Sequence, residues 1–388
     1  MLEKNLSLEE IFNLAIEKHK LKHFKIAEEL YNKILIKKPN HIQTIFSLGT
    51  LFVETNNLQS AIKLFQKVIR LQPKYALAYS NLGMIYIELK NFANAVVCLK
   101  TAIIINPDLT NTRNTLCILL RSLAPAKFGE KEQQDFKDLF IILYKRNDVD
   151  HNDIFSNAKN VLFGEKNYKE ILKEESKPPL LENINIKNLI KEDLFLLMMQ
   201  KSLISDPFIE KILIQIRKEI LIGNNNRKKD INDNFDFIVS FAEQCSLNEH
   251  VYIRTKNETE QIKILQANLE KNKKINELDV AILGCYVPLN TSEKLKEKLI
   301  NYKSKNILFD DLIALQIKEI DKEEQLKTTI KFNDNITDEV SKKVRNQYEE
   351  NPYPRWRHLY TNDRKNFLIG LQNQIKPNKI NVEPNNKF

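Results

Sequence analysis

Three prolines divide the N-terminal third of the chain at equal intervals. Pro39, Pro73 and Pro107 follow one another at a spacing of 34 residues, and the same pattern of small and large residues precedes each. Small residues recur at the eighth and twentieth positions of each unit, namely Ala15, Gly49, Gly83, Ala27, Ala61 and Ala95. Small side chains let two helices pack closely, and proline ends the second helix because it lacks a backbone donor. Each unit is therefore expected to be two helices and a turn.

This pattern is typical of tetratricopeptide repeats. We assign three repeats, at residues 8–41, 42–75 and 76–109. Residues 110–123 should form a further helix that covers the open apolar end of the last repeat, which gives a first domain over residues 1–123. Ser7, with Glu10 three residues later, predicts a capping box at the start of the first helix.

The rest of the chain is predicted to be a second helical domain, so that the fold class is all-α. We expect a linker at 124–133, where Pro125 and Gly129 occur, a helical domain at 134–340, and a motif with a C-terminal tail at 341–388. Asp206 before Pro207 predicts a helix start, and Gly223 predicts that helix's end. Helical periodicity of apolar residues occurs over 136–144, 186–204, 207–222, 235–246, 258–272 and 276–286.

Composition narrows the functional classes. The net charge of +9 accompanies 42% hydrophobic and 29% charged residues, which is an ordinary globular mixture. Lysines alternate with acids, and the densest basic clusters, at 227–229 and 271–274, have no interleaved aromatic residues, so nucleic acid is not the expected partner. No apolar run approaches the roughly 20 residues that span a bilayer, and no signal peptide is evident, so we expect a cytoplasmic protein without membrane contact.

Cysteines and histidines give no metal or catalytic site. Cys98, Cys117, Cys245 and Cys285 are widely separated, which is typical of buried free thiols. His19 and His23 lie one helical turn apart, but no carboxylate clearly completes a site, so we interpret them as a surface pair. We therefore assign no metal ligand, no catalytic residue and no cofactor to this chain.

Three further stretches carry a family resemblance. They are FDFIVSFAEQCSLNEHVYIRTKNETEQI at 235–262, LGCYVPLN at 283–290 and VRNQYEENPYPRW at 344–356. With the repeats, they resemble bacterial tetratricopeptide-repeat proteins that carry a C-terminal S-adenosylmethionine-dependent methyltransferase domain, and this resemblance covers nearly the whole chain. In that family the segment matching 347–356 lies upstream of the glycine-rich strand and loop that begin the cofactor fold.

The resemblance implies a catalytic domain that we do not expect within these residues. Such a domain needs closely spaced glycines, because only glycine lets the backbone wrap the cofactor without an intervening side chain. The chain has 7 glycines, no two within one loop. The eighteen residues after Gly370 are fewer than the roughly 30 of a βαβ unit. S-adenosylmethionine is implied only if a methyltransferase domain follows, and whether the protein is an enzyme stays open.

The segment at 347–356 has two interpretations. In the favoured one, a helix ends before Pro352, and Tyr353 and Trp356 pack on the helical domain as ordinary anchors. In the other, the segment is an interface that meets a cofactor domain. Its candidate interface residues are Tyr348, Asn351, Tyr353, Arg355 and Trp356.

The repeats offer a candidate binding groove. The second, sixth, ninth and thirteenth positions of each first helix should face the concave side of the array. The candidates are Asn13, Lys20, Gln43, Ser47, Thr50, Glu54, Leu77, Asn81, Met84 and Glu88. Such a surface suits an extended or helical peptide, and Asn13 and Asn81 can pair with its backbone. Lys20 has no basic neighbour in this set, so a clamp for a C-terminal carboxylate is not expected. The alternative, that these are only solvated polar positions, stays open.

These observations predict a non-catalytic module that binds a peptide or partner protein through the groove. The main alternative is the binding or regulatory portion of a methyltransferase whose catalytic domain is missing from this chain. A third and weaker interpretation is a basic scaffold on nucleic acid, which salt-sensitive binding would support. Partner identity, methyl acceptor and oligomeric state are not determined by the sequence.

Overall fold

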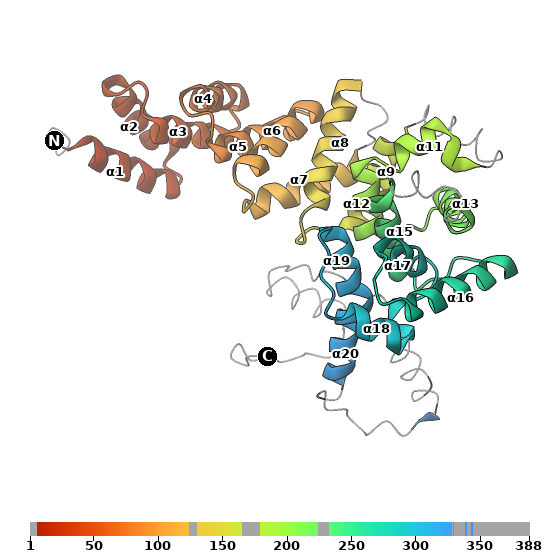
Figure 1. The fold of residues 1–388 in the computed structure, drawn as a ribbon. Coiled ribbons are helices and arrows are strands. Elements are labelled where there is room, and N and C mark those ends of the chain that lie inside the picture. The colour runs from red at the N-terminus through yellow and green to blue at the C-terminus, as the bar shows by residue number, and fades with distance from the viewer. Residues whose placement is uncertain are drawn as a thin grey trace. The chain divides into compact units, whose positions relative to one another are not determined.

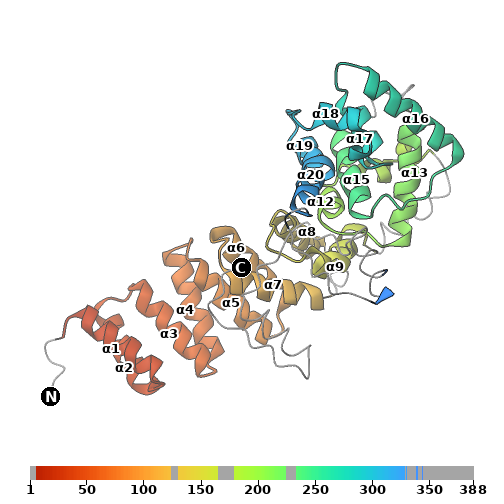
Figure 2. The same ribbon diagram turned by 90° about the horizontal axis from the view of Figure 1, so that it is seen from below.

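The computed structural model divides the chain into two compact units, Met1–Leu139 and Phe140–Phe388 (Figure 1). It describes residues 6–123, 130–164, 179–223 and 233–327, together with the isolated residues 329, 338, 339 and 343. Within these ranges every regular element is a helix, which confirms the predicted all-α fold class. Figure 2 shows the helices of the first unit following one another in pairs.

The first unit is an array of helix pairs. The first helices of the pairs are α1 (Leu8–Lys20), α3 (Ile42–Glu54) and α5 (Ala76–Glu88). The second helices are α2 (Phe24–Lys37), α4 (Leu58–Leu71) and α6 (Phe92–Ile105), and α7 (Thr110–Ser122) follows. The starts of α1, α3, α5 and α7 recur every 34 residues, as the sequence period predicts.

Local side chains determine where these helices begin and end. The Ser7 hydroxyl accepts a hydrogen bond from the Glu10 amide at 3.2 Å, and the Glu10 carboxylate accepts one from the Ser7 amide at 2.7 Å, which confirms the capping box. Asn57 and Asn91 cap α4 and α6 by one hydrogen bond each, which their side-chain oxygens accept from the amides of Ser60 and Asn94. Each second helix ends two residues before its proline, since proline cannot donate the next hydrogen bond.

One left-handed residue connects the two helices of every pair. Lys22, Asn56 and Lys90 have φ values of 60°, 59° and 56° and occupy the same position of the three repeats. The residue after each left-handed one donates its backbone amide to a carbonyl in the last turn of the first helix. In the third repeat, for example, Asn91 N donates to Tyr86 O at 2.8 Å. This closure satisfies carbonyls that would otherwise lack a partner and turns the chain sharply into the second helix.

The repeated small residues allow the two helices of a pair to approach. A Cβ atom added at Gly83 would lie 2.7 Å from two side-chain atoms of Leu99, and one at Gly49 would lie 2.9 Å from the Phe65 ring. Both distances are too short for real carbon contacts, so glycine is required by packing at these positions. Ala15, Ala27, Ala61 and Ala95 are fully buried for the same reason.

The second unit contains helices of more varied length. Helix α8 (Glu130–Tyr144) crosses the division between the units. The following elements are α9 (His151–Phe163), η2 (Leu180–Glu182), α11 (Ile184–Leu189), α12 (Asp193–Lys201), α13 (Pro207–Gly223), α15 (Phe235–Leu247), α16 (Lys256–Lys271), α17 (Glu277–Gly284), η3 (Leu289–Thr291), α18 (Glu293–Leu299), α19 (Ile307–Ile313), η4 (Ala314–Lys318) and α20 (Glu319–Lys327).

Several of these bounds differ from the sequence-based ones. The helix expected over 186–204 is two helices, α11 and α12, and the second starts where Asp193 places negative charge at a helix N-terminus. Helix α8 begins at Glu130, inside the stretch expected to be a linker, whereas residues 124–129 lie outside the described residues. Helix α9 was not predicted, although Asp150 caps it by accepting from the Asn152 amide. Asp206 does cap α13, through the amides of Phe208 and Ile209.

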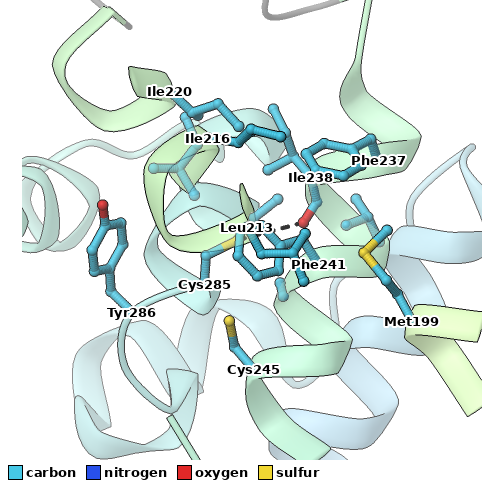
Figure 3. Packing of buried hydrophobic residues seen from close by; sticks show 14 of the residues in the cluster. Met199, Leu213, Ile216, Ile220, Phe237, Ile238, Phe241, Cys245, Cys285 and Tyr286 are labelled. Carbon is cyan, nitrogen blue, oxygen red and sulfur yellow. Dashed lines mark hydrogen bonds between the residues drawn. The ribbon is translucent and has the colours of Figure 1, made fainter. Parts of the chain in front are cut away.

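Helix α15 lies at the centre of the second unit, in contact with α12, α17 and α19. Every residue from Phe237 to Ser246 is buried, so the helix has no solvent-facing side over that length. Figure 3 shows side chains of α12, α13 and α15 gathered with Cys285 and Tyr286. Three of the four cysteines are buried as predicted, whereas Cys117 is half-buried.

A widened helical turn joins the last helices to this core. Residues Ala314–Lys318 form a π-helix around Gln316, whose side chain is fully buried. Its amide nitrogen donates to Ala242 O at 2.9 Å and Gly284 O at 3.3 Å, and its oxygen accepts from the Leu289 amide at 3.2 Å. One side chain thus satisfies three backbone groups from three different elements.

Candidate peptide-binding surface

The first helices of the repeats form one continuous row. Helix α1 contacts α3, and α3 contacts α5, so residues on the free side of these helices share a surface. Among the predicted groove residues, seven are exposed, namely Asn13, Lys20, Gln43, Glu54, Leu77, Met84 and Glu88. The other three, Ser47, Thr50 and Asn81, are half-buried. We call the surface made by these ten residues the first-helix face.

Helix α5 contributes an apolar part of the first-helix face. Leu77 and Met84 are 46% and 47% exposed and lie seven residues apart, on the same side of the helix. Asn81 lies between them, four residues after Leu77 and three before Met84. The helix therefore presents two exposed apolar side chains with a half-buried amide between them.

Two predicted groove residues take part in a contact between repeats. His19 Nε2 lies 3.4 Å from Glu54 Oε1, and His19 Nδ1 lies 3.3 Å from the Tyr31 hydroxyl. Burial raises the pKa of Tyr31 to about 12, against the opposing effect of its hydrogen bond with Ser47. The interpretation of His19 and His23 as a surface pair is wrong for His19, because its ring packs on Tyr31 and meets the Glu54 carboxylate. Ser47 and Glu54 of the second repeat therefore contact Tyr31 and His19 of the first repeat.

Thr50 is also occupied within its own helix. Its hydroxyl donates to Phe46 O at 3.1 Å, which leaves only the oxygen lone pairs for an incoming group. The amide side chains of the first-helix face are those of Asn13, Gln43 and Asn81.

The motif residues cannot be placed in this way. Tyr348, Asn351, Tyr353, Arg355 and Trp356 lie outside the described residues.

A buried arginine organises the second unit. Arg217 of α13 is 2% exposed, and its guanidinium lies 4.2 Å from the centroid of the Tyr286 ring. Its Nη1 donates to Cys285 O at 3.2 Å, and its Nη2 donates to Ile253 O at 2.8 Å and Tyr252 O at 3.4 Å. Two of the three stretches that carry the family resemblance, 235–262 and 283–290, therefore meet at this side chain.

Glu258 lies in the same polar cluster. Its carboxylate accepts from the Tyr286 hydroxyl at 2.9 Å and from the Thr255 amide at 2.7 Å. Burial alone would raise the pKa of Glu258, but the hydrogen bonds from Thr255 and Tyr286 and the charge of Arg217 outweigh it and lower that pKa. The cluster thus holds a buried carboxylate in its charged form.

The sequence analysis missed Arg217, Glu258 and Gln316. Arg217 adjoins Ile216 on the apolar side of α13, between Leu213 and Ile220, so a charge on an apolar stripe was the available signal. Glu258 follows Thr255 in the pattern of a capping box, which the structure contains. Gln316 gave no such signal.

Comparison with known families decides the nature of the first unit. The family model described as tetratricopeptide repeat matches residues 76–109, and a second model, described as TPR repeat, matches residues 49–89. The chain contains tetratricopeptide repeats. Such repeats indicate a protein-interaction module, because their helix rows bind peptides or partner proteins.

Solved structures resemble the chain only distantly. The crystal structure of MamA protein is 19% identical, covers 45% of this chain and 96% of that chain, and has a TM-score of 0.30. The structure of Naa15/Naa10 bound to HypK-THB is 14% identical, covers 75% of this chain and 45% of that chain, and has a TM-score of 0.29. At these scores neither similarity carries an argument. No curated protein matches the chain.

Two features are absent from the described residues. No described helix, in the tetratricopeptide repeats or in the second unit, is long and apolar enough to cross a membrane. In the same residues, no group of three or more His, Cys, Asp or Glu side chains could hold a metal ion.

Proposed function

We propose that the chain is a non-catalytic module that binds a peptide, or an extended segment of a partner protein, on the first-helix face. The observation that carries this proposal is the pair of exposed apolar side chains, Leu77 and Met84, on either side of Asn81. Apolar side chains in this arrangement supply affinity, and amides beside them supply hydrogen bonds to a peptide backbone. Asn13 and Gln43 extend the polar part of the surface along α1 and α3.

The double variant Leu77→Glu with Met84→Glu should weaken peptide binding at least about 10-fold, because it places charge where apolar contact is needed. Peptides are first selected from a displayed library against the full chain, and their dissociation constants are then measured by fluorescence anisotropy. Both side chains are about half exposed, so we expect the helix content by circular dichroism to stay unchanged.

The matched control is Ile26→Glu with Ile36→Glu. It adds the same two charges at exposed isoleucines of the second helix α2. This control should bind the selected peptides as the wild type does. Peptides that bind the two double variants equally well would refute the first-helix face as the binding site.

A second candidate function is the binding or regulatory portion of an S-adenosylmethionine-dependent methyltransferase. It is favoured by the meeting of the stretches 235–262 and 283–290 around Arg217, since both belong to the family resemblance. In this case S-adenosylmethionine would bind to a domain other than the two units described above. The motif residues Tyr348, Asn351, Tyr353, Arg355 and Trp356 would meet that domain.

Reading the gene through and beyond the codon for Phe388 tests this second candidate. A frame that continues into a strand, closely spaced glycines and a helix is the expected result. A stop codon directly after Phe388 would contradict a methyltransferase domain on the same polypeptide. In calorimetry, the 388-residue chain should release no binding heat when it is titrated with S-adenosylmethionine. Measurable binding would contradict our assignment of the cofactor to another domain.

A further inference from the structure

The second helices of the repeats carry charge very unevenly. From Thr55 to Ile87 the sequence contains Lys63, Lys67, Arg70 and Lys74 and neither Asp nor Glu. We call these four residues the basic stripe. Lys63, Arg70 and Lys74 are exposed, and Lys67 is half-buried.

The basic stripe lies on the outer side of α4. Ala61, Phe65 and Val68 of the same helix are fully buried, and at 3.6 residues per turn Lys63, Lys67 and Arg70 point the opposite way. Lys74 follows in the turn after the helix. Over seven residues of helix the three cations span about 10 Å, so they form a narrow row.

Contact with the neighbouring turn extends this row. Lys67 Nζ donates to Pro39 O at 2.7 Å, which brings the turn after α2 against the middle of α4. Lys37 and Lys38, both exposed, directly precede that proline. Within the described residues, no ion pair joins a carboxylate to any residue of the basic stripe.

The next repeat has no cations at the positions of the three charged residues of α4. One repeat later, the positions of Lys63, Lys67 and Arg70 are occupied by Val97, Thr101 and Ile104. Like charges three and four residues apart on a helix destabilise it, and here no acid offsets them. A row that costs stability and is absent from the next repeat is expected to serve binding.

The chemistry of the neighbouring repeat favours a protein partner over a nucleic acid. Val97 and Ile104 are 41% and 58% exposed on α6. Exposed aliphatic side chains suit the apolar edge of a protein segment, whereas single-stranded nucleic acid is held by aromatic side chains that stack on bases. The second-helix side thus offers cations on one repeat and aliphatic contacts on the next.

We propose that the basic stripe, with Val97 and Ile104, binds an acidic amphipathic segment of a partner protein. Its carboxylates would meet Lys63, Lys67 and Arg70, and its apolar edge would meet Val97 and Ile104. This surface is separate from the first-helix face and does not depend on it.

The test uses the full chain and a synthetic 20-residue helical peptide with Glu on one edge and Leu on the other. The variant Lys63→Glu with Arg70→Glu should weaken its binding at least about 10-fold at low salt, because two attractions become repulsions. Val97→Ser with Ile104→Ser should weaken it about 3-fold or more. The matched control, Lys271→Glu with Lys274→Glu on exposed positions of α16 and its following turn, changes net charge equally and should bind within about 2-fold of wild type.

Further arms separate the competing explanations. A peptide of the same composition in scrambled order should bind at least about 10-fold more weakly, because its charges no longer share one edge. Equal binding of the two peptides, or equal loss in the Lys271→Glu, Lys274→Glu control, would overturn the proposal. A 20-nucleotide oligothymidylate is tested in the same way. If it binds more tightly than the acidic peptide and Lys63→Glu with Arg70→Glu weakens its binding, the proposal is overturned in favour of nucleic acid. Leu77→Glu with Met84→Glu should leave binding of the acidic peptide unchanged. Failure of the basic-stripe proposal can therefore be told apart from failure of the first-helix-face proposal.

Discussion

Replacing Arg217 with Ala should lower the free energy of unfolding of the second unit by about 3–5 kcal/mol. The substitution removes the donor from the carbonyls of Cys285 and Tyr252, whose hydrogen bonds with Arg217 are buried, and from the part-buried carbonyl of Ile253. It also removes the cation beside the buried Glu258 and opens a cavity against the Tyr286 ring. Urea unfolding of the full chain, followed by far-UV circular dichroism, measures the change.

Two companion variants make the Arg217 result interpretable. Arg217→Lys keeps the charge but loses the planar guanidinium that reaches several carbonyls. Its free energy of unfolding should therefore lie between those of the wild type and Arg217→Ala. Arg254→Ala removes an exposed arginine from the neighbouring loop and should change stability by no more than about 0.5 kcal/mol. A loss below about 1 kcal/mol for Arg217→Ala would contradict its role as the organiser of this unit.

Replacing Phe65 with Ala should lower the free energy of unfolding of the repeat unit by about 3–5 kcal/mol. The ring is fully buried and packs against Phe46, with ring centroids 5.5 Å apart, and against Gly49. Because each repeat contacts only its neighbours, a cavity in the second repeat weakens the coupling on both sides. In the same urea experiment, Phe65→Ala should destabilise the unfolding transition of the repeat unit, which Arg217→Ala should leave unchanged.

A double-mutant cycle with Gly49 tests the packing geometry behind this prediction. Gly49→Ala alone should destabilise the unit, since its Cβ would lie 2.9 Å from the Phe65 ring. In the Phe65→Ala background that clash is gone, and the higher helix propensity of Ala should make the same change stabilising by up to about 1 kcal/mol. Absence of the sign reversal would refute the close approach of α3 and α4. As a surface control, Ile36→Ala, at a position 80% exposed, should change stability by less than about 0.5 kcal/mol.

Sequence-based prediction succeeded where the determining interactions are local. The capping box of Ser7 and Glu10 and the cap of α13 at Asp206 each depend on residues within three positions of one another. The repeats were predictable because their packing contacts, although longer in range, recur every 34 residues. Prediction failed for His19, whose partners Tyr31 and Glu54 come from α2 and α3. It also failed for the break between α11 and α12, where apolar periodicity over 186–204 had suggested one helix.

The amino-acid sequence alone determined the all-α fold class, the 34-residue period of the repeats and the small residues that let their helices pack, because the period repeats the same local and nearest-neighbour contacts. Only the tertiary structure decided which of the predicted groove residues are exposed and which contact the neighbouring repeat. Ser47 and Glu54 are engaged between repeats, whereas Leu77 and Met84 are exposed. Arg217 is likewise paired with carbonyls from segments more than thirty residues away in the sequence, which no periodic pattern records.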